Sequence, residues 1–466
     1  MQHNKVWSAD ALSEALGIET SVSGNIIIFN SQDITKGDIF ITLPSANGEN
    51  RALQYIGQAF EMGAAGCITI LCEQTQHYPL EKMIYVKDLY QSLDQMALYK
   101  RKKSGAIFIA ITGTCGKTTV KNMIYQLIAP SKNAFLGYKS FNNNLGVRIC
   151  LASIQEDAEC AILELGMSST NEIRDLTSIV KHDIAVITNI GPGHIGSFES
   201  IEQIASAKSE IFENMSDKGI AVLPRDSDHL EYLLDAAKKK NLKVYKYGFL
   251  QDCDAQILQH SSDPFGTNLK IRVLDEHMDV KIPLQGKHQA LNFLAAILCS
   301  KLLGADTGKS LKAAENIQLP EMRGTKFQLK IGKMNVGLID KSYNANPLSV
   351  RGTFAELGHI SNRKILILGD MLALGSHSLD LHKALKQDLI DSKIDQVIMV
   401  GEFSKYLYDM IPAKMQLFHA LSAESALPQI LQHIKDQDVI IVQGSRGMRM
   451  DKVVSYLSHL SSAGDA

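Results

Sequence analysis

The sequence predicts a mixed α/β protein built from three domains. Its 466 residues are enough for two to four domains of about 100–200 residues each. Strand-length apolar runs alternate with helical segments, a pattern typical of parallel sheets covered by helices. The pattern is interrupted near residues 104 and 320. We therefore expect an N-terminal domain at 1–103, a central domain at 104–319 and a C-terminal domain at 320–466.

Composition and charge exclude several classes of protein. The net charge is −2, so a basic surface for nucleic acid is not expected. No run of 18 apolar residues occurs, which argues against membrane insertion. The seven scattered cysteines contain no CxxC pair, so we expect neither a disulfide framework nor a cysteine zinc site. The polar N-terminal residues predict no signal peptide, and we expect a soluble protein of the reducing cytoplasm.

The N-terminal domain combines short strands with an amphipathic helix. Strands are expected at 25–29, 38–43 and 66–71, and the helix at 52–62. The basic sequence Lys-Arg-Lys-Lys-Ser-Gly at 100–105 follows, and we interpret it as a solvated hinge.

The central and C-terminal domains repeat the α/β pattern. Buried parallel strands are expected at 107–111, 161–165 and 184–188, a run of antiparallel strands at 245–283, and a buried helix at 289–303. In the C-terminal domain we expect strands at 364–368, 396–400 and 439–442 and helices at 379–390, 422–434 and 448–460. Alternating strands and helices predict a Rossmann-like α/β domain there.

A phosphate-binding loop is expected directly after strand 107–111. The sequence Thr-Gly-Thr-Cys-Gly-Lys-Thr-Thr at 112–119 leads into a helix, so backbone N–H groups would surround a phosphate chain. Lys117 would reach the β- and γ-phosphates, and the Thr118 hydroxyl would bind magnesium. The match departs from the common P-loop, because Ile111 replaces its first glycine. A chance helix cap is the alternative, and the strand before and helix after favour the phosphate loop, making the central domain P-loop-like.

Two residues downstream can complete a phosphoryl-transfer site. Glu164 ends one strand, and His194 follows the next on a glycine-rich loop, so both reach the edge where open α/β sheets bind ligands. Each alone would be interpreted as a cap or turn residue. Together with the phosphate loop they favour a metal-assisted site. Lys208, on a helix with small residues, is by itself expected to be an ordinary solvated lysine.

These motifs, in this order, resemble the Mur ligase family, the ATP-dependent amide-forming ligases of peptidoglycan precursor synthesis. The shared strings lie at 112–119, 164–166, 188–194, 207–208 and 286–292. Further strings at 140–147, 338–347, 368–372 and 444–450 look like the branch that adds D-alanyl-D-alanine, and Ser-Tyr-Asn-Ala-Asn-Pro at 342–347 is the most discriminating. The resemblance is strong over 105–454 and weak before residue 104.

The resemblance implies a role for each matching residue. It implies ATP binding by Gly113, Thr114, Gly116, Lys117, Thr118, Thr119, His288, Asn292, Arg323 and Asp340. It implies a magnesium site made of Thr118, Glu164, His194 and a carbamylated Lys208, with Lys117, His194 and Lys208 as the catalytic set. It implies substrate contacts by Ser31, Asn142, Asn143, Tyr343, Asn344, Asn346 and Arg446.

The implied activity is ligation of D-alanyl-D-alanine to UDP-N-acetylmuramoyl-tripeptide through an acyl-phosphate, with ATP and Mg²⁺, by a cytoplasmic monomer in cell wall synthesis. Two alternatives stay open: a sister ligase with another amine or acceptor, and a P-loop protein that binds nucleotide without ligating. The chain departs from the family at Gln289, Lys341, Ala373 and Gln443. The loop at 51–55 also departs, which leaves uridine recognition open.

Overall fold

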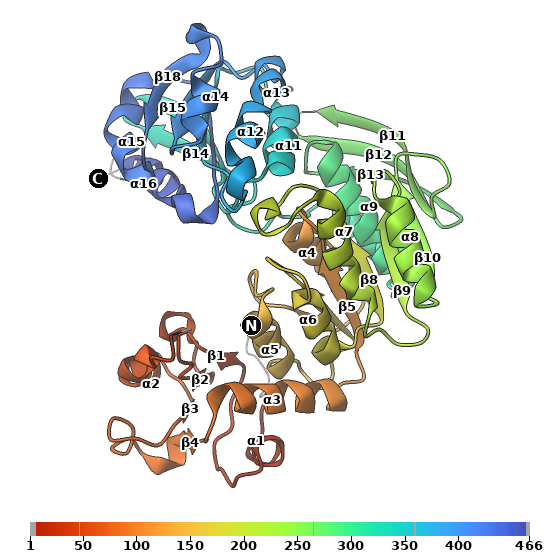
Figure 1. Ribbon diagram of the computed structural model, residues 1–466, viewed down its shortest axis with the longest axis vertical. Helices are drawn as coiled ribbons and strands as arrows, with labels where there is room; N and C mark the ends of the chain where they lie inside the picture. The colour runs from red at the N-terminus through yellow and green to blue at the C-terminus, as the bar shows by residue number, and fades with distance from the viewer. Residues whose placement is uncertain (1–5, 46, 264, 358–359, 463–466) are drawn as a thin grey trace.

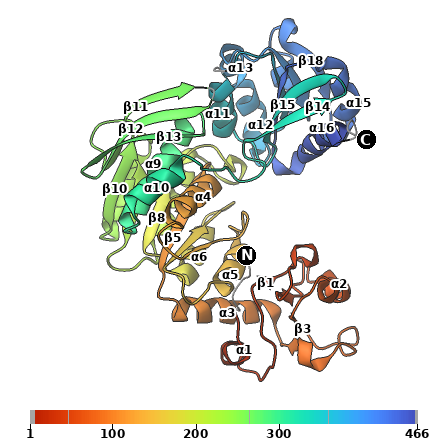
Figure 2. The ribbon, with the colours of Figure 1, turned by 180° about the vertical axis from the view of Figure 1, so that it is seen from behind.

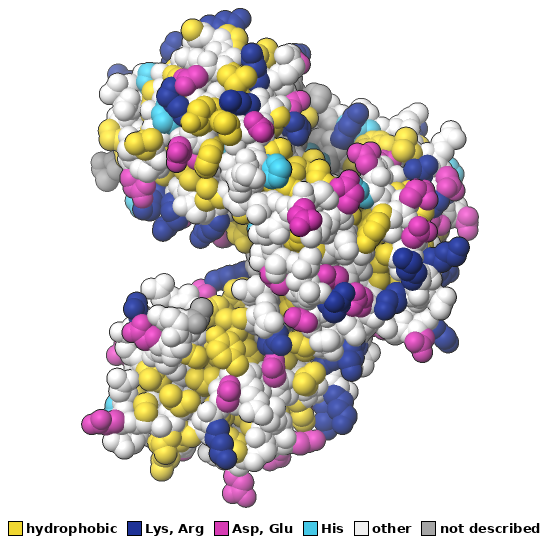
Figure 3. Space-filling model, viewed as in Figure 1, with side chains coloured by type: hydrophobic (Ala, Val, Ile, Leu, Met, Phe, Trp, Pro, Cys, Tyr) yellow, Lys and Arg dark blue, Asp and Glu magenta, His cyan; other side chains and the backbone are white. Residues whose placement is uncertain are grey.

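The computed structural model describes residues 6–45, 47–263, 265–357 and 360–462. These residues form three sheets, one in each of three domains. The N-terminal and C-terminal domains both extend from the central one, and they face each other across an open space (Figure 1). In the space-filling view this space is a deep notch in the molecule (Figure 3). The predicted fold class of three α/β domains is confirmed.

The N-terminal domain is a parallel sheet in the order β1-β2-β3-β4. Its strands are β1 (Ile27–Ile28), β2 (Ile39–Ile41), β3 (Gly66–Thr69) and β4 (Met83–Tyr85), and its helices are α1 (Ala9–Leu16), α2 (Ile56–Glu61) and α3 (Leu89–Lys103). The helix expected at 52–62 begins as a 3₁₀ turn and becomes α-helical only at Ile56. All three residues of β2 are buried, as expected for a strand covered on both faces.

The basic run at 100–105 is not the solvated hinge that the sequence predicted. Its lysines form the last turn of α3, where cations are favourable next to the helix C-terminus. Lys100 is only 1% exposed and lies 4.5 Å from the centroid of the Trp7 ring. Its Nζ donates to the Val6 carbonyl and pairs with Glu156 at 3.3 Å. Lys100 is therefore part of the packing between the N-terminal and central domains, while Lys102 and Lys103 are exposed.

The central domain contains a mixed sheet in the order β13-β12-β11-β10-β9-β8-β5-β7-β6. Its strands are β5 (Ile107–Thr112), β6 (Ala134–Leu136), β7 (Cys160–Glu164), β8 (Ile184–Ile187), β9 (Ile220–Pro224), β10 (Lys243–Gly248), β11 (Ala255–Asp263), β12 (Gly266–Val273) and β13 (Glu276–Ile282). Strands β5 to β11 form the parallel part of this sheet, and the antiparallel pairs are β11–β12 and β12–β13. The expectation of antiparallel strands from residue 245 was wrong for β10, which extends the parallel part.

Helices cover both faces of this sheet. They are α4 (Lys117–Ile128), α5 (Asn144–Ala152), α6 (Glu172–Val180), α7 (Ile201–Ser209), α8 (Leu230–Lys239), α9 (Lys287–Leu302) and α10 (Thr307–Ala314). Side chains alternate along β5, so Ile109 and Ile111 join the core under α4 and α9, while Phe108 and Ala110 join the opposite core. Figure 2 shows α4, α9 and α10 together on one face. The carboxyl end of β5 lies in the middle of the sheet, where the phosphate loop begins.

The C-terminal domain has a sheet in the order β14-β15-β19-β16-β17-β18, parallel except for the β14–β15 hairpin. The strands are β14 (Thr325–Ile331), β15 (Met334–Lys341), β16 (Lys364–Gly369), β17 (Gln396–Val400), β18 (Gln416–Ala420) and β19 (Val439–Gln443), and the helices are α11 (Pro347–Leu357), α12 (Ser378–Lys383), α13 (Lys386–Asp391), α14 (Ser404–Tyr408), α15 (Ala423–Ile430) and α16 (Asp451–Ser462). The helix expected at 379–390 is split in two, and α16 starts after the left-handed Arg449 rather than at 448.

Among the described residues no helix is both long and apolar enough to cross a membrane. All seven cysteines are free thiols.

Candidate active site

The phosphate loop joins β5 to α4 through two glycines with positive φ. Gly113 has φ +146° and Gly116 has φ +80°. A Cβ at Gly113 would lie 1.9 Å from Thr188 Oγ1, and one at Gly116 would lie 2.7 Å from Asn292 Oδ1. Both positions therefore require glycine for space as well as for conformation. The residue that caps α4 is Gly116, which has no side chain to occupy the first N–H groups of the helix, so those groups can bind phosphate.

The segment that follows β8 holds this loop in shape. The N–H groups of Thr114 and Cys115 donate to the backbone and side-chain oxygens of Asn189, at 3.1 and 2.9 Å. The Thr114 hydroxyl exchanges hydrogen bonds with Gly191, accepting from its N–H and donating to its carbonyl, both at 3.0 Å. Thr188 donates to the carbonyl of Cys115. The Thr-Asn-Ile string at 188–190 thus positions the phosphate loop.

A buried carboxylate lies at the first turn of α4. Glu164, at the end of β7, is 2% exposed and accepts from Thr118 Oγ1 at 2.7 Å and from Asn142 Nδ2 at 2.8 Å. Burial raises its pKa, but the charges of Lys117 and Lys121 and the two hydrogen bonds outweigh burial, so the net pKa is lowered. Glu164 is therefore an ionised carboxylate beside a hydroxyl and two lysines.

Lys208 is not the solvated helix lysine that its sequence context suggests. It is 4% exposed on α7, and burial followed by the charge of Lys117 lowers its pKa well below the usual value. Cys115 of the phosphate loop acts in the opposite direction and raises the pKa of Lys208 to a smaller extent. A lysine in this setting favours the neutral amine. His194 lies nearby in a left-handed conformation, and desolvation followed by the charges of Lys117 and Lys208 lowers its pKa.

The phosphate loop opens into a cleft of about 650 Å³ between the central and C-terminal domains. Residues of both domains line it: Thr114, Gly116, Lys117, Thr118, Thr119, Asn142, Glu164, His194, His288 and Asn292 from one, and Arg323, Tyr343, Asn344, Asn346 and Arg446 from the other. Two of the hydrogen bonds that join the domains lie close to the phosphate loop. Cys115 Sγ donates to Asn346 Oδ1 at 3.1 Å, and Arg323 Nη2 donates to Ser140 Oγ at 3.2 Å.

Several residues expected at the site do not line this cleft. Asp340 is buried and accepts from the N–H and hydroxyl of Ser342 at 2.9 and 2.6 Å, so it stabilises the turn after β15. Asn143 caps α5 by accepting from the N–H of Gly146 at 2.8 Å. Ser31 is in the N-terminal domain, where it donates to Gln58 at 2.8 Å. Gly113 and Lys208 also do not line the cleft.

Sequence reasoning missed Lys121, which organises the loop at 137–143. It is 1% exposed on α4, and its Nζ donates to the carbonyls of Gly137 at 2.7 Å and of Lys139. This loop carries Ser140 and Asn142 to the cleft. The only available signal was a lysine four residues after Lys117 on the apolar side of the helix.

The donor set at Thr118 and Glu164 fits magnesium. Mg²⁺ in nucleotide sites is usually held by one or two protein oxygens together with the phosphates, and an ionised carboxylate 2.7 Å from a hydroxyl provides those oxygens. Among the described residues, no group of three or more His, Cys, Asp and Glu side chains is placed to hold a metal. The protein part of the site would thus be incomplete without the nucleotide's own oxygens.

Comparison with known protein families shows to which family the chain belongs. Residues 111–300 match the Mur ligase middle domain, and residues 327–446 match the Mur ligase, glutamate ligase domain. The chain belongs to the Mur ligase family. The family resemblance of the motifs is thereby confirmed, and the chain is a ligase.

Relatives of this Mur ligase are similar over nearly the whole length. The chain is 34% identical over 455 residues to the UDP-N-acetylmuramoyl-tripeptide--D-alanyl-D-alanine ligase of Rickettsia prowazekii, covering 97% of this chain and 99% of the relative. It is 29% identical to the Bacillus subtilis protein of the same name, covering 92% of each chain. A crystal structure of MurF from Acinetobacter baumannii superposes with a TM-score of 0.81 at 25% identity, covering 98% of this chain and 100% of that one.

Proposed function

We propose that this Mur ligase joins the amine of D-alanyl-D-alanine to the terminal carboxylate of UDP-N-acetylmuramoyl-tripeptide, coupled to cleavage of ATP into ADP and phosphate. The observation that carries the proposal is the cleft, in which the phosphate loop faces Tyr343, Asn344, Asn346 and Arg446 of the C-terminal domain. The chain is similar over nearly its full length to relatives named as D-alanyl-D-alanine ligases of this tripeptide, which supports the choice of amine and acceptor.

The nucleotide phosphates bind on the N-terminal turn of α4. Lys117 Nζ, which donates to the Gly113 carbonyl at 2.8 Å in this structure, turns to the β- and γ-phosphates when they are present. Thr118 and Glu164 would hold Mg²⁺, with His194 at the edge of the site, and the ion would neutralise part of the phosphate charge. Asn292 and His288, on α9, bind the nucleoside side of ATP. Arg323 approaches the phosphates from the C-terminal domain.

Two bond exchanges make the amide. An oxygen of the peptide carboxylate bonds to the γ-phosphorus while the β–γ bridging bond breaks, and ADP leaves from an acyl-phosphate. The amine nitrogen of D-alanyl-D-alanine then bonds to the acyl carbon, forming a tetrahedral intermediate that loses a proton from nitrogen and expels phosphate. Lys117 stabilises the charge that develops on the transferred group in the first step.

Closure of the C-terminal domain protects the acyl-phosphate from water. The contacts Cys115–Asn346 and Arg323–Ser140 join the two domains on either side of the phosphate loop, and they support a closed arrangement during the reaction. Because Arg323 also lies 4.0 Å from the Tyr343 ring centroid, its guanidinium is held flat against the C-terminal side.

The remaining roles follow from position and chemistry. The N-terminal domain, residues 1–103, with Ser31 and the loop residues Asn142 and Asn143, binds the UDP-linked peptide, which reaches the cleft across the notch (Figure 3). Residues 104–319 bind ATP, and residues 320–466 bind the dipeptide. Lys208 carries a carbamate, formed when its neutral amine bonds to CO₂ and loses a proton. Seven free thiols support a cytoplasmic location, and we propose a monomer.

A ligation assay with mass-resolved products tests the proposal. With ATP, UDP-N-acetylmuramoyl-tripeptide and D-alanyl-D-alanine, we expect one product whose mass equals the two substrates minus water. Single amino acids in place of the dipeptide, and other acceptors in place of the tripeptide, test for a sister ligase. Nucleotide binding with no product from any pair would show a protein that binds without ligating.

A further inference from the structure

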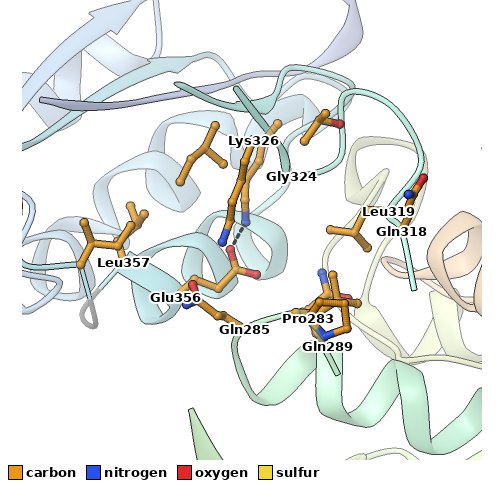
Figure 4. Close-up of a pocket in the computed structure, with 14 residues that line it drawn as sticks. Pro283, Gln285, Gln289, Gln318, Leu319, Gly324, Lys326, Glu356 and Leu357 are labelled. Carbon is orange, nitrogen blue, oxygen red and sulfur yellow. Dashed lines mark hydrogen bonds and ion pairs between the residues drawn. The ribbon is translucent and has the colours of Figure 1, made fainter. Parts of the chain in front are cut away.

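The carboxylate of Glu356 joins the C-terminal domain to the central domain beside the nucleotide cleft. Glu356 lies on α11, and its Oε1 is 2.8 Å from Nε2 of His288, in the first turn of α9. Its Oε2 pairs with Lys341 at the end of β15. Figure 4 shows Glu356 reaching from its helix, with the dashed line marking the pair with Lys341. The carboxylate of Glu356 therefore contacts Lys341 of the C-terminal domain and His288 of the central domain.

This carboxylate is ionised, and its charge is compensated within the C-terminal domain. The side chains of Glu356 and Lys341 are 14% and 12% exposed. Burial raises the pKa of Glu356, but the Lys341 and His288 partners outweigh burial and lower it to about 2. Because Lys341 already balances the charge, the hydrogen bond to His288 can be made by a neutral imidazole.

The hydrogen bond determines which ring nitrogen of His288 can accept. With Nε2–H donating to Glu356, Nδ1 of the neutral ring carries a lone pair. The backbones of Gly286 and Gly352 lie close to this side of the ring, since a Cβ would lie 3.1 Å from Nδ1 at Gly286 and 3.4 Å from it at Gly352. The side chain of His288 is 39% exposed, and His288 and Gly352 both line the nucleotide cleft. The ring is therefore accessible to a ligand in the cleft, and Nδ1 is its acceptor.

The triad of Lys341, Glu356 and His288 also separates two hollows. Glu356 lines a cavity of about 270 Å³ (Figure 4), His288 lines the cleft, and Lys341 and Gln289 line both. Lys341 thus belongs to the wall of the nucleotide cleft, Glu356 lies on the other side of that wall, and both come from the domain that closes over the cleft. The orientation of His288 depends on that domain being docked.

We propose that Glu356, held by Lys341, is a positioning residue that keeps His288 Nδ1 available to accept a hydrogen bond from the nucleoside of the bound nucleotide. The inference rests on the proposed function in one respect, the binding of a nucleotide in this cleft. Nucleotide affinity then depends on the C-terminal domain, because the residue that orients the ligand contact comes from it. The nucleoside donor is a ribose hydroxyl or the adenine amine, which are the neutral donors available.

Two double variants separate this role from a merely structural one. Lys341→Met with Glu356→Gln removes both charges and keeps an oxygen that accepts from His288. Lys341→Met with Glu356→Leu removes the charges and the oxygen at similar volume, and a buried ion pair replaced by apolar residues often retains stability. Each is also made with His288→Ala. Asp388→Ala, which breaks the exposed Arg351–Asp388 pair of the same region, is the matched control.

Calorimetric binding of ADP and of inorganic tripolyphosphate is the measurement. We expect the Leu variant to bind ADP about tenfold more weakly than the Gln variant, the value for one lost hydrogen bond. Adding His288→Ala should weaken the Gln variant equally and leave the Leu variant unchanged. Tripolyphosphate, which uses only the phosphate loop, should bind all variants alike. With 2′-deoxy-ADP or inosine diphosphate, the difference between the variants should disappear for the analogue that lacks the donor.

Equal ADP affinity of the Gln and Leu variants would overturn the inference, as would an additive effect of His288→Ala. Weaker binding of tripolyphosphate by the Leu variant alone would also overturn it, because it would show general damage to the cleft. These outcomes are independent of ligation. Failure of the wild-type protein to bind ADP would refute the proposed function itself, whereas ADP binding without the predicted product would refute only the ligation step.

Discussion

Replacing Lys121 by methionine tests how the loop at 137–143 is held in place. Methionine keeps most of the volume and removes the ammonium that donates to the carbonyls of Gly137 and Lys139. Gly137 is buried, so its carbonyl loses its partner in a dry environment, while Lys139 is exposed and its carbonyl can bind water. One unsatisfied buried acceptor costs about 1–3 kcal/mol, and relief of lysine burial offsets part of that.

The lost free energy should appear as weaker binding of the acceptor substrate, UDP-N-acetylmuramoyl-tripeptide. The loop carries Asn142, which contacts Glu164, and Ser140, which contacts Arg323. If 1–3 kcal/mol of loop order is lost, KM for UDP-N-acetylmuramoyl-tripeptide should rise by about 5- to 150-fold. The ADP affinity should change by less than about threefold, because Thr114 and Cys115 are held by Asn189 rather than by this loop.

Steady-state ligation kinetics and calorimetric ADP binding measure these two quantities. Lys121→Arg, which keeps a charged donor, should recover part of the lost affinity, and Lys239→Met, an exposed lysine on α8, is the matched control. An unchanged KM for the acceptor in Lys121→Met would refute the reasoning. An equal loss of affinity for the tripeptide substrate and for ADP would also refute it, because the effect would then not be confined to the loop at 137–143.

Three further changes test other parts of the site. Gly116→Ala should weaken ADP binding by tenfold or more, because the Cβ would lie 2.7 Å from Asn292 at φ +80°, whereas Gly304→Ala, at φ +67° with open space around it, should leave binding unchanged. Glu356→Gln should lower thermal stability at neutral pH. Since the folded pKa of Glu356 is depressed from 4.5 to about 2, the difference from wild type should be full above pH 4.5 and vanish as pH falls towards 2. Lys208→Ala should abolish ligation and remove a carbamate signal seen by ¹³C NMR in the wild-type protein with labelled bicarbonate; full activity would contradict its role.

Local sequence was sufficient to find the phosphate loop and the fold class. The buried strand, the glycine turn and the following helix are adjacent in the chain, so their geometry follows from neighbouring residues. The proximity of Glu164 to Thr118 needed only the rule that parallel strands end at one edge, whereas the contact of Glu164 with Asn142 was not expected. Family membership, which the motifs indicated, is confirmed by both matching domains.

Long-range burial of charge could not be predicted from the sequence. Lysines are normally solvated, so nothing in the local pattern distinguishes Lys100 and Lys208 from surface lysines, and Lys121 had only its place on the apolar side of the helix. Lys100 and Lys121 are buried because Val6 and the loop at 137–143, which are distant in the sequence, supply carbonyl acceptors. Glu356 had no motif at all, because its partners come from two other segments. Such contacts are created by tertiary packing alone.

The most direct test of the central claim is the substrate dependence of phosphate release. With ATP present, we expect phosphate and a mass-confirmed amide product in equal amounts only when UDP-N-acetylmuramoyl-tripeptide and D-alanyl-D-alanine are both supplied, and neither from a Lys117→Ala variant. Stoichiometric phosphate without the amide, or full ligation by Lys117→Ala, would contradict the account.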